Sequence, residues 1–230
     1  MKLLVLPGLD GNGALHDQFV AGFDPAAINV EVVRYPTELT RYSDLVDWMS
    51  LRLPDEDFTI VAESFSGAIA ISIAAAKPSH LRGIAFVATF ASSPMKLPKQ
   101  FAELLRILPM KSQTLLKIAQ PLLMGRWSTE TFFVKFHEVM QNLPRDTIIN
   151  RVKQVLQIDL AAKIKEIEVP YVYLSASQDR LIPKSAMDQF QLDPSQVIHL
   201  EGTHFVLQAN PQYAAKAISE FVSSLEAENQ

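Results

Sequence analysis

Ser64 is the side chain whose surroundings most clearly point to chemistry. Residues 58–62 before it form a short apolar run rich in β-branched residues, and residues 68–76 after it are small, apolar and compatible with a helix. The pattern predicts a strand, a sharp turn with Ser64 at its apex, and a helix. Such a turn lifts a serine hydroxyl clear of the sheet and directs helix amide groups toward developing negative charge. The alternative interpretation is a buried turn with an incidental serine.

This turn departs from the G-x-S-x-G pattern that commonly surrounds such a serine. Ala62 and Ser66 stand where the pattern has glycines. Glycine adopts strained backbone angles most easily, but both replacements are small enough to let a strand and a helix approach closely. Ser66 is the rival nucleophile, although we expect it one step into the helix rather than at the apex.

A carboxylate and a histidine follow two later strand-like runs. Residues 171–175 form a β-rich run, and a polar turn that carries Asp179 comes next. Residues 196–200 are predicted to form the last strand, and His204 lies just beyond them. Ligand chemistry in parallel sheets occurs at the C-terminal ends of the strands. Ser64, Asp179 and His204 are therefore candidates to meet at one edge of a sheet.

Four segments of the chain resemble the α/β-hydrolase superfamily, and they follow each other in that superfamily's order. The resemblance spans nearly the whole chain, although Pro7-Gly8 stands where the superfamily usually has His-Gly in its oxyanion loop. The members that look most similar are small, lidded esterases and thioesterases with a Pro-Gly-x-Asp-Gly loop near the start. The four segments are residues 3–11, 62–67, 176–183 and 202–205.

The resemblance implies a catalytic triad that works without a metal ion or cofactor. Ser64 would be the nucleophile, His204 the general base, and Asp179 the acid that orients the imidazole. The backbone amides of Leu9 and Phe65 would form the oxyanion hole, where placement of the backbone matters more than the identity of the side chain.

Each assignment leaves an alternative open. Asp179 could cap a turn or the helix that begins near Pro183, and His204 could be an ordinary loop histidine. His16, near the predicted oxyanion loop, is the main rival base among the five histidines. Glu63 is unusual beside a site that develops negative charge, and it could either face solvent or tune the substrate range.

The rest of the sequence alternates strand-like and helix-like runs. Continuous apolar strands separated by helices indicate a parallel sheet covered on both faces. We predict an α/β fold with a mostly parallel sheet of about six strands flanked by helices, an α/β-hydrolase fold shortened at its N-terminus. The expected strands are 3–6, 30–34, 58–62, 83–88, 171–175 and 196–200, and the expected helices between them include 43–53, 67–77, 184–191 and 211–225.

No strand-like run occurs between about residues 92 and 168. This region instead shows helical periodicity over residues 100–108, 112–123, 129–141 and 146–157, and prolines punctuate it. Such an insertion corresponds to the lid that similar hydrolases carry over the active site. We therefore expect residues 1–93 and 169–230 to form one core domain, with a helical lid at residues 94–168 between its two parts.

We expect an apolar substrate pocket between lid and core. Methionine adapts to irregular shapes and suits variable acyl chains. At least half of the apolar candidates are expected only to pack lid against core. The predicted substrate-binding residues are Phe90, Met95, Met124, Trp127 and Phe205, and the further candidates are Phe65, Phe101, Leu104, Phe132, Phe133 and Met140.

Composition limits the partners of the protein. The net charge of −4 argues against nucleic acid, and the absence of cysteine excludes disulfides, thiolate metal sites and a cysteine nucleophile. The N-terminal apolar run is too short for a secretory signal, and no apolar run is long enough for a membrane span. We therefore expect a cytoplasmic protein without a membrane-spanning segment.

Charge is divided unevenly between the two predicted parts. Residues 96–165 contain 12 Lys and Arg against 5 Asp and Glu, whereas the rest of the chain contains 9 against 20. Solvated helix faces that happen to be basic are the simpler explanation. The alternative is a lid that attracts an anionic substrate or an acidic acyl carrier protein.

Together these observations predict a serine hydrolase that cleaves a small-molecule carboxylic ester through an acyl-enzyme intermediate. Cleavage of a thioester, or of an acyl ester borne on a carrier protein, is the nearest alternative. A non-catalytic protein that binds a ligand in the same pocket is another, and carbon–carbon bond hydrolysis and acyl transfer, which use the same triad, also stay open.

Overall fold

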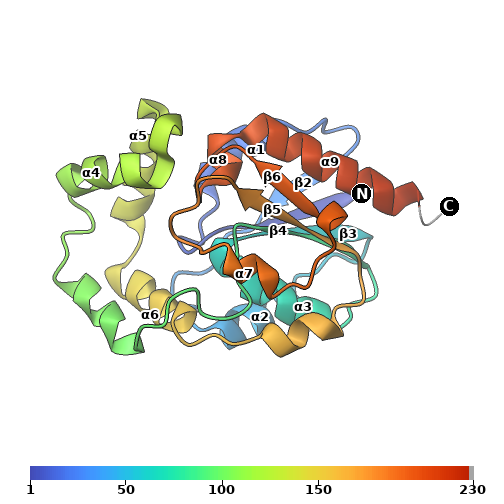
Figure 1. Ribbon diagram of the computed structural model, residues 1–230, viewed down its shortest axis with the longest axis horizontal. Helices are drawn as coiled ribbons and strands as arrows, with labels where there is room; N and C mark the ends of the chain where they lie inside the picture. The colour runs from blue at the N-terminus through green and yellow to red at the C-terminus, as the bar shows by residue number, and fades with distance from the viewer. Residues whose placement is uncertain (228–230) are drawn as a thin grey trace.

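A six-stranded parallel sheet forms the centre of the computed structural model, which describes residues 1–227 apart from the side chain of Leu122. Each strand pairs in parallel with its neighbours in the sheet (Figure 1). The spatial order is β2 (Asn29–Val32), β1 (Lys2–Leu6), β3 (Phe58–Glu63), β4 (Leu81–Val87), β5 (Tyr171–Ala176) and β6 (Val197–Leu200). The six strands predicted from the sequence are all present, each within two residues of its expected ends.

Alternate side chains of the strands build two separate apolar layers, because successive residues of a strand point to opposite faces of the sheet. Leu4 and Leu6 of β1 join one cluster, which packs against α2 (Tyr42–Ser50), α3 (Gly67–Ala75) and α7 (Ser185–Asp188). Leu3 and Val5 join the other cluster. That second layer packs against α1 (Asp17–Val20), α8 (Val206–Ala209) and α9 (Pro211–Ala227), so helices cover both faces of the sheet (Figure 1).

Between β4 and β5 the chain leaves the sheet and forms a group of helices to one side of it (Figure 1). We refer to residues 94–168 as the helical segment. Ser112 and Thr129 begin two of these helices, and each side chain accepts a hydrogen bond from the amide three residues later. The helices of this group are η3 (Lys99–Arg106), α4 (Gln113–Met124), η4 (Gly125–Trp127), α5 (Glu130–Asn142) and α6 (Arg145–Val155), whereas η5 (Ala161–Glu166) follows them and packs Ile164 into the apolar layer of α3.

Backbone hydrogen bonds hold the entry and the exit of this segment side by side. The amide of Ser93 donates to the carbonyl of Ile158 at 2.9 Å, and the amide of Leu160 donates to the carbonyl of Ala91 at 2.8 Å. The chain therefore returns to the point where it left the sheet before it enters β5.

The helices differ from expectation in two respects. Residues 100–108 were predicted to form an α-helix, but η3 is a 3₁₀-helix, which has three residues per turn. The short helices α1 and α8 were not predicted, because four residues are too few to show a helical period. Within residues 1–227, no helix combines the length and the apolar character needed to cross a membrane.

Candidate active site

Ser64 lies at the sharp turn between β3 and α3. Its φ angle is 49°, in the left-handed region that residues with a side chain rarely adopt. The single turn η2 (Ser64–Ser66) follows at once and leads into α3. The structure thus has the strained strand–turn–helix arrangement that the sequence predicted around this serine.

Contacts from three other segments hold this turn in place. The hydroxyl of Thr89, just after β4, donates to the carbonyl of Ser64. A Cβ atom at Gly67 would lie 2.0 Å from Oγ1 of Thr89, so only glycine fits at the start of α3. The hydroxyl of Ser66 donates to the carbonyl of Pro7 and shares a hydrogen bond of 2.8 Å with the hydroxyl of Tyr35. Ser66 therefore does what glycine cannot, because it ties the turn to the loop after β1.

Ser64, His204 and Asp179 converge at the C-terminal edge of the sheet. Oγ of Ser64 lies 2.8 Å from Nε2 of His204, and Nδ1 of His204 lies 3.0 Å from Oδ2 of Asp179. The carboxylate makes the tautomer with a proton on Nδ1 favourable, which leaves the lone pair of Nε2 to accept the serine proton. His204 and Asp179 are both largely buried. The three side chains therefore meet at one place, as the order of the turns along the sequence predicted.

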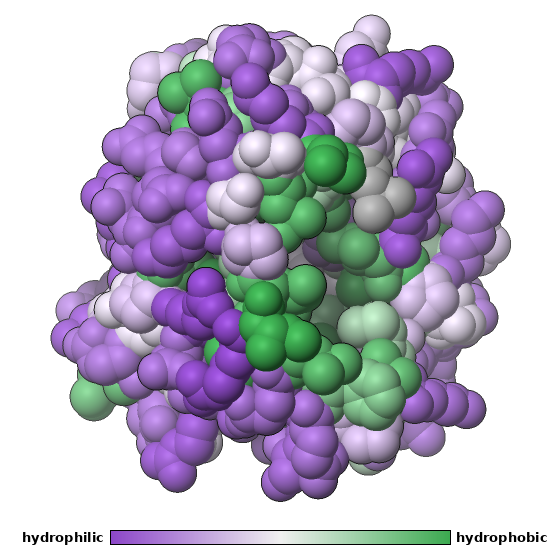
Figure 2. All heavy atoms as spheres, turned by 90° about the vertical axis from the view of Figure 1, so that its left-hand side faces the viewer, coloured by the Kyte–Doolittle hydropathy of each residue, from purple (hydrophilic) through white to green (hydrophobic). Residues whose placement is uncertain are grey.

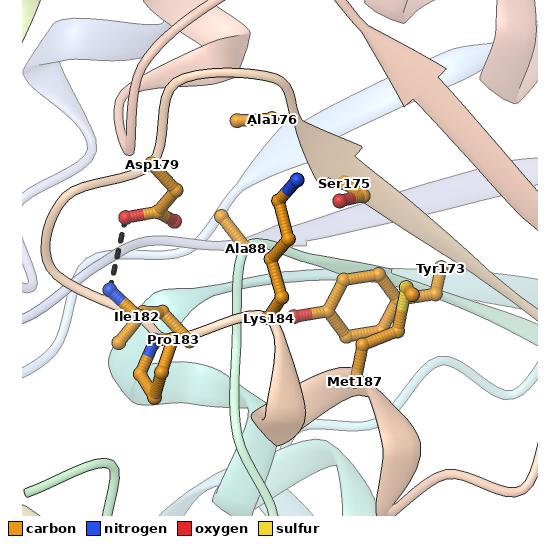
Figure 3. Close-up of a pocket in the computed structure, with 9 residues that line it drawn as sticks. All are labelled: Ala88, Tyr173, Ser175, Ala176, Asp179, Ile182, Pro183, Lys184 and Met187. Atoms are coloured by element: carbon orange, nitrogen blue, oxygen red, sulfur yellow. Dashed lines mark hydrogen bonds between the residues drawn. The ribbon is translucent and has the colours of Figure 1, made fainter.

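The turn after β5 fixes the carboxylate of Asp179. Its Oδ1 atom accepts hydrogen bonds from the amides of Leu181 at 2.8 Å and Ile182 at 2.9 Å. Figure 3 shows the second of these bonds, with Lys184 extending beside the same turn toward the end of β5. Asp179 thus also caps its turn, as the alternative interpretation expected, while its other oxygen faces His204. The two roles use different oxygens and do not compete.

Arg151 of α6 ties the helical segment to the loop that follows β1. Its side chain is completely buried, and it donates hydrogen bonds of 3.0–3.1 Å to the carbonyls of Leu9, Asp10, Pro36 and Leu39. A Cβ atom at Gly11 would lie 2.3 Å from Nη1 of Arg151, so this glycine leaves room for the guanidinium. Arg151 therefore holds the loop that carries Leu9 through hydrogen bonds to the carbonyl groups of that loop.

Leu9 and Phe65, whose amides were predicted to form the oxyanion hole, both line the cavity beside Ser64. Phe65 follows the serine directly, and its ring stacks on Tyr42 of α2 with centroids 4.6 Å apart. The oxyanion role of the two amides stays a prediction.

A buried ion pair lies directly behind the nucleophile. Nε2 of His16 lies 2.9 Å from Oε2 of Glu63, and both side chains are almost fully buried. Burial alone would lower the pKa of His16, but the carboxylate of Glu63, helped by Asp10 and by the hydrogen bond to the carbonyl of Gly13, outweighs it and raises that pKa. Burial likewise opposes ionisation of Glu63, yet His16 holds its pKa below the usual value. His16, the main rival base, is therefore engaged with Glu63 rather than with Ser64.

The candidate nucleophile opens into a largely apolar cavity of about 360 Å³. The cavity is lined from the core by Phe90 and Phe205, and from the helical segment by Met95, Phe136 and Met140. Three of the five predicted substrate-binding residues, Phe90, Met95 and Phe205, therefore reach it.

Met124 and Trp127 were also predicted to line the pocket, but they are not among the residues around the cavity. Met124 is buried where α4 ends and contacts Thr203, the neighbour of His204. The ring of Trp127 is covered by the guanidinium of Arg126, 4.4 Å from its centroid. Both side chains pack the helical segment against the core, as expected for at least half of the apolar candidates.

Sequence reasoning missed two polar features of the site. Arg151 lies on the buried side of α6, together with Thr147, Ile148 and Val155, which are three or four residues away. A cation at an inward position of an amphipathic helix was the signal that could have identified it. The pairing of His16 with Glu63 had no local signal, because 47 positions separate the two residues.

Comparison with known proteins gives one family model that matches this chain. The model described as "Serine aminopeptidase, S33" matches residues 38–196. The matched region is more than half of the chain and includes Ser64 and Asp179.

One curated relative and many solved structures are also similar. "Putative carbamate hydrolase RutD" of Azorhizobium caulinodans is 28% identical over 134 residues, which cover 56% of this chain and 51% of the relative, so the chain matches about half of that protein's length. A bromoperoxidase from Bacillus anthracis has a TM-score of 0.80 at 12% identity, covering 96% of this chain and 91% of that structure. A lipase-esterase related protein from Clostridium acetobutylicum has a TM-score of 0.76 at 18% identity, covering 96% and 93%. At such identities the structural likeness shows the fold.

Replacing Arg151 by methionine tests its role as an anchor. We expect the free energy of unfolding to fall by about 3 kcal/mol or more, because four carbonyl groups lose a charged donor at once. Arg145→Met on the same helix is the matched control, since Arg145 donates to a single carbonyl, that of Arg106. Urea unfolding curves measure both variants. Equal losses of stability in the two variants would contradict the anchoring role.

The ion pair behind the nucleophile predicts a pH-dependent stability difference. Glu63→Gln should lower the free energy of unfolding by about 1.5–3 kcal/mol, most strongly between about pH 4.5 and 6.5. Because folding lowers the pKa of Glu63, the folded state is stabilised at pH values above the pKa that Glu63 has in the unfolded chain. This stability is lost as the pH falls through the pKa in the folded state. Because folding raises the pKa of His16, the folded state is stabilised at pH values below the pKa that His16 has in the unfolded chain. This stability is lost as the pH rises through the pKa in the folded state. Urea unfolding of both proteins across this range measures the difference, and a difference independent of pH would count against the charged pair.

Proposed function

Because this chain belongs to the serine aminopeptidase S33 family, within the α/β-hydrolase superfamily, we propose that it is a serine hydrolase that cleaves carboxylic esters. Membership of the family supports hydrolysis as the reaction class. The ester substrate and the triad of Ser64, His204 and Asp179 are our proposal.

The observation that carries the proposal is the continuous hydrogen-bonded chain from Oγ of Ser64 through the imidazole of His204 to Asp179. A serine hydroxyl is a weak nucleophile unless an adjacent base accepts its proton. Here the base is in contact with the hydroxyl, and its other nitrogen is oriented by a carboxylate that is itself held by two amides. This geometry favours a working nucleophile over a non-catalytic binding protein.

The proposed reaction has two steps. Ser64 Oγ forms a bond to the ester carbonyl carbon while His204 takes its proton, and the carbonyl oxygen becomes an oxyanion facing the amides of Leu9 and Phe65. When the carbon–oxygen bond to the alcohol breaks, His204 returns the proton to the leaving alkoxide. Water then attacks the acyl-enzyme with the same base, which releases the acid and restores the serine hydroxyl.

The cavity supports an uncharged, apolar substrate rather than a peptide with a free amino terminus. An aminopeptidase must hold an α-ammonium group, and the carboxylates that line this cavity are Asp10 and Glu63. Glu63 is already paired with His16. Burial raises the pKa of Asp10, which weakens its ability to hold a cation. An ester with an apolar acyl chain fits these walls better.

A thioester, or an acyl ester carried by an acidic protein, is the second candidate. The excess of Lys and Arg over Asp and Glu in residues 96–165 favours it. We also propose that the helical segment acts as a lid, since Met95, Phe136 and Met140 form one side of the cavity that Ser64 opens into.

Replacing the proposed nucleophile tests the assignment directly. Ser64→Ala should reduce turnover of short p-nitrophenyl esters on the order of 10⁴-fold or more, because the acyl-enzyme cannot form. Ser72→Ala, on the helix α3 that follows this turn, is the matched control and should keep full activity, since its hydroxyl donates to the carbonyl of Ala68 in the same helix. Retention of a tenth of the rate by Ser64→Ala would refute the nucleophile.

A substrate profile tests the choice of ester. We expect kcat/KM to rise with acyl length until the cavity of about 360 Å³ is filled, and to be lower for the aminoacyl anilides that aminopeptidases cleave. Free esters, thioesters and carrier-linked esters of one acyl group should be compared side by side. A clear preference for the aminoacyl anilides would overturn the ester proposal while leaving the triad intact.

A further inference from the structure

Large apolar side chains that are exposed to solvent concentrate at the start of the helical segment. More than half of those among the described residues lie between positions 95 and 108. Single exposed apolar residues are normal, whereas a contiguous group marks an interaction surface. We call this group the outer face, and it consists of Met95, Leu97, Phe101, Leu104, Ile107 and Leu108.

The 3₁₀ geometry of η3 aligns the centre of the outer face. With three residues per turn, side chains three positions apart lie one above the other. Phe101 and Leu104 therefore lie in one row, and Ile107, just past the end of η3, continues it because its amide donates to the carbonyl of Leu104; the three side chains are 49%, 53% and 81% exposed. On another side of the same helix, Ala102 and Leu105 pack inward against α6. A helix that is apolar on two sides is normally covered on both, but here one apolar side is open.

The outer face borders the mouth of the substrate cavity. Met95 belongs to the outer face and also lines the cavity, and the exposed Leu181, in the turn after β5, lines it as well. Figure 2 shows apolar atoms gathered around the hollow on the side of the molecule that carries α4 to α6. Met95 therefore connects the apolar side chains of the outer face to the apolar wall of the cavity that Ser64 opens into.

Basic residues accompany the apolar row. Lys96 and Lys99 are exposed and, among the described residues, form no ion pair. The one acidic residue between positions 95 and 111 is Glu103. It is engaged by Arg106 and Lys153, each at 2.5 Å, so it leaves the lysines uncompensated. The surface thus presents apolar side chains and positive charge together.

We propose that the outer face docks on the surface of an anionic lipid bilayer. The row of Phe101, Leu104 and Ile107 would enter the boundary between head groups and acyl chains, while Lys96 and Lys99 meet anionic head groups. A second copy of this chain fits less well, because a two-fold contact would bring two identical basic surfaces together. An acidic protein fits less well, because the centres of protein interfaces are depleted of lysine, whereas Lys96 and Lys99 accompany the apolar side chains of this face.

Vesicle sedimentation tests this surface separately from catalysis. The Ser64→Ala protein, which leaves the lipids intact, is mixed with vesicles of phosphatidylcholine or of equal parts phosphatidylglycerol and phosphatidylcholine. We expect binding to the anionic vesicles, and on the order of tenfold weaker binding for the double variant Leu104→Gln/Ile107→Gln. Leu51→Gln is the matched control. Leu51 is 85% exposed, but it lies just after α2 and outside the helical segment.

A charge-reversal pair tests the electrostatic part. Lys96→Glu/Lys99→Glu should remove the preference for anionic vesicles, whereas Lys216→Glu on α9 should keep it. With Ser64 restored, each of these variants should hydrolyse short soluble esters at the parental rate, which shows that the fold and the site are intact. The hydrolysis assay also separates the two proposals. If lipid binding fails while ester hydrolysis is normal, only the lipid proposal is refuted and the proposed function is not.

Three results would overturn the lipid proposal. The first is no sedimentation with anionic vesicles, and the second is an equal loss of binding in Leu51→Gln. The third is that the outer face binds something else. This would be seen as a dimer in analytical ultracentrifugation, or as binding of an acidic acyl carrier protein in a titration, that the outer-face variants abolish.

Discussion

The contact on which the rest of the site depends is the hydrogen bond between the hydroxyl of Ser64 and the imidazole of His204. It joins residues 140 positions apart, and it can form only because all strands run in one direction and end at one edge of the sheet. A change in the register or direction of β3 or β6 would separate the two groups. The burial of both apolar layers, which sets the direction and register of these strands, therefore places the two groups within reach of each other.

Buried polar groups then set the finer geometry around the nucleophile. Thr89, Ser66 and Arg151 each use a side chain to donate a hydrogen bond to a backbone carbonyl of a loop or turn. Such bonds hold loops that have no strand partner, and they are costly to leave unmade in the interior. Arg151 has a second consequence, since it couples the helical segment to the loop of Leu9. Movement of α6 would therefore displace the backbone of Leu9, and with it the proposed oxyanion site.

The sequence was sufficient for the sheet and for the convergence of Ser64, His204 and Asp179. Strands such as β3 are buried on both sides and therefore appear as continuous apolar runs, and the order of the polar turns after them is a local feature. The fold class and the superfamily predicted from these features are confirmed by the parallel sheet and by the family match.

What the sequence could not give depends on packing between distant segments. The pairing of His16 with Glu63 has no local pattern, and the inward turn of Met124 follows from how α4 ends against the core. Apolar composition alone cannot tell a side chain that packs two parts together from one that lines a cavity. It also could not show that the row of η3 would be left uncovered, because that depends on 3₁₀ rather than α-helical geometry.

A crystal structure of the protein after reaction with an alkyl fluorophosphonate would test the central claim most directly. The proposed chemistry predicts a phosphorus–oxygen bond to Oγ of Ser64, with the phosphonyl oxygen within hydrogen-bond distance of the amides of Leu9 and Phe65 and the alkyl chain in the apolar cavity. An adduct on another residue, or an unmodified Ser64 still bonded to His204 after prolonged exposure, would contradict it.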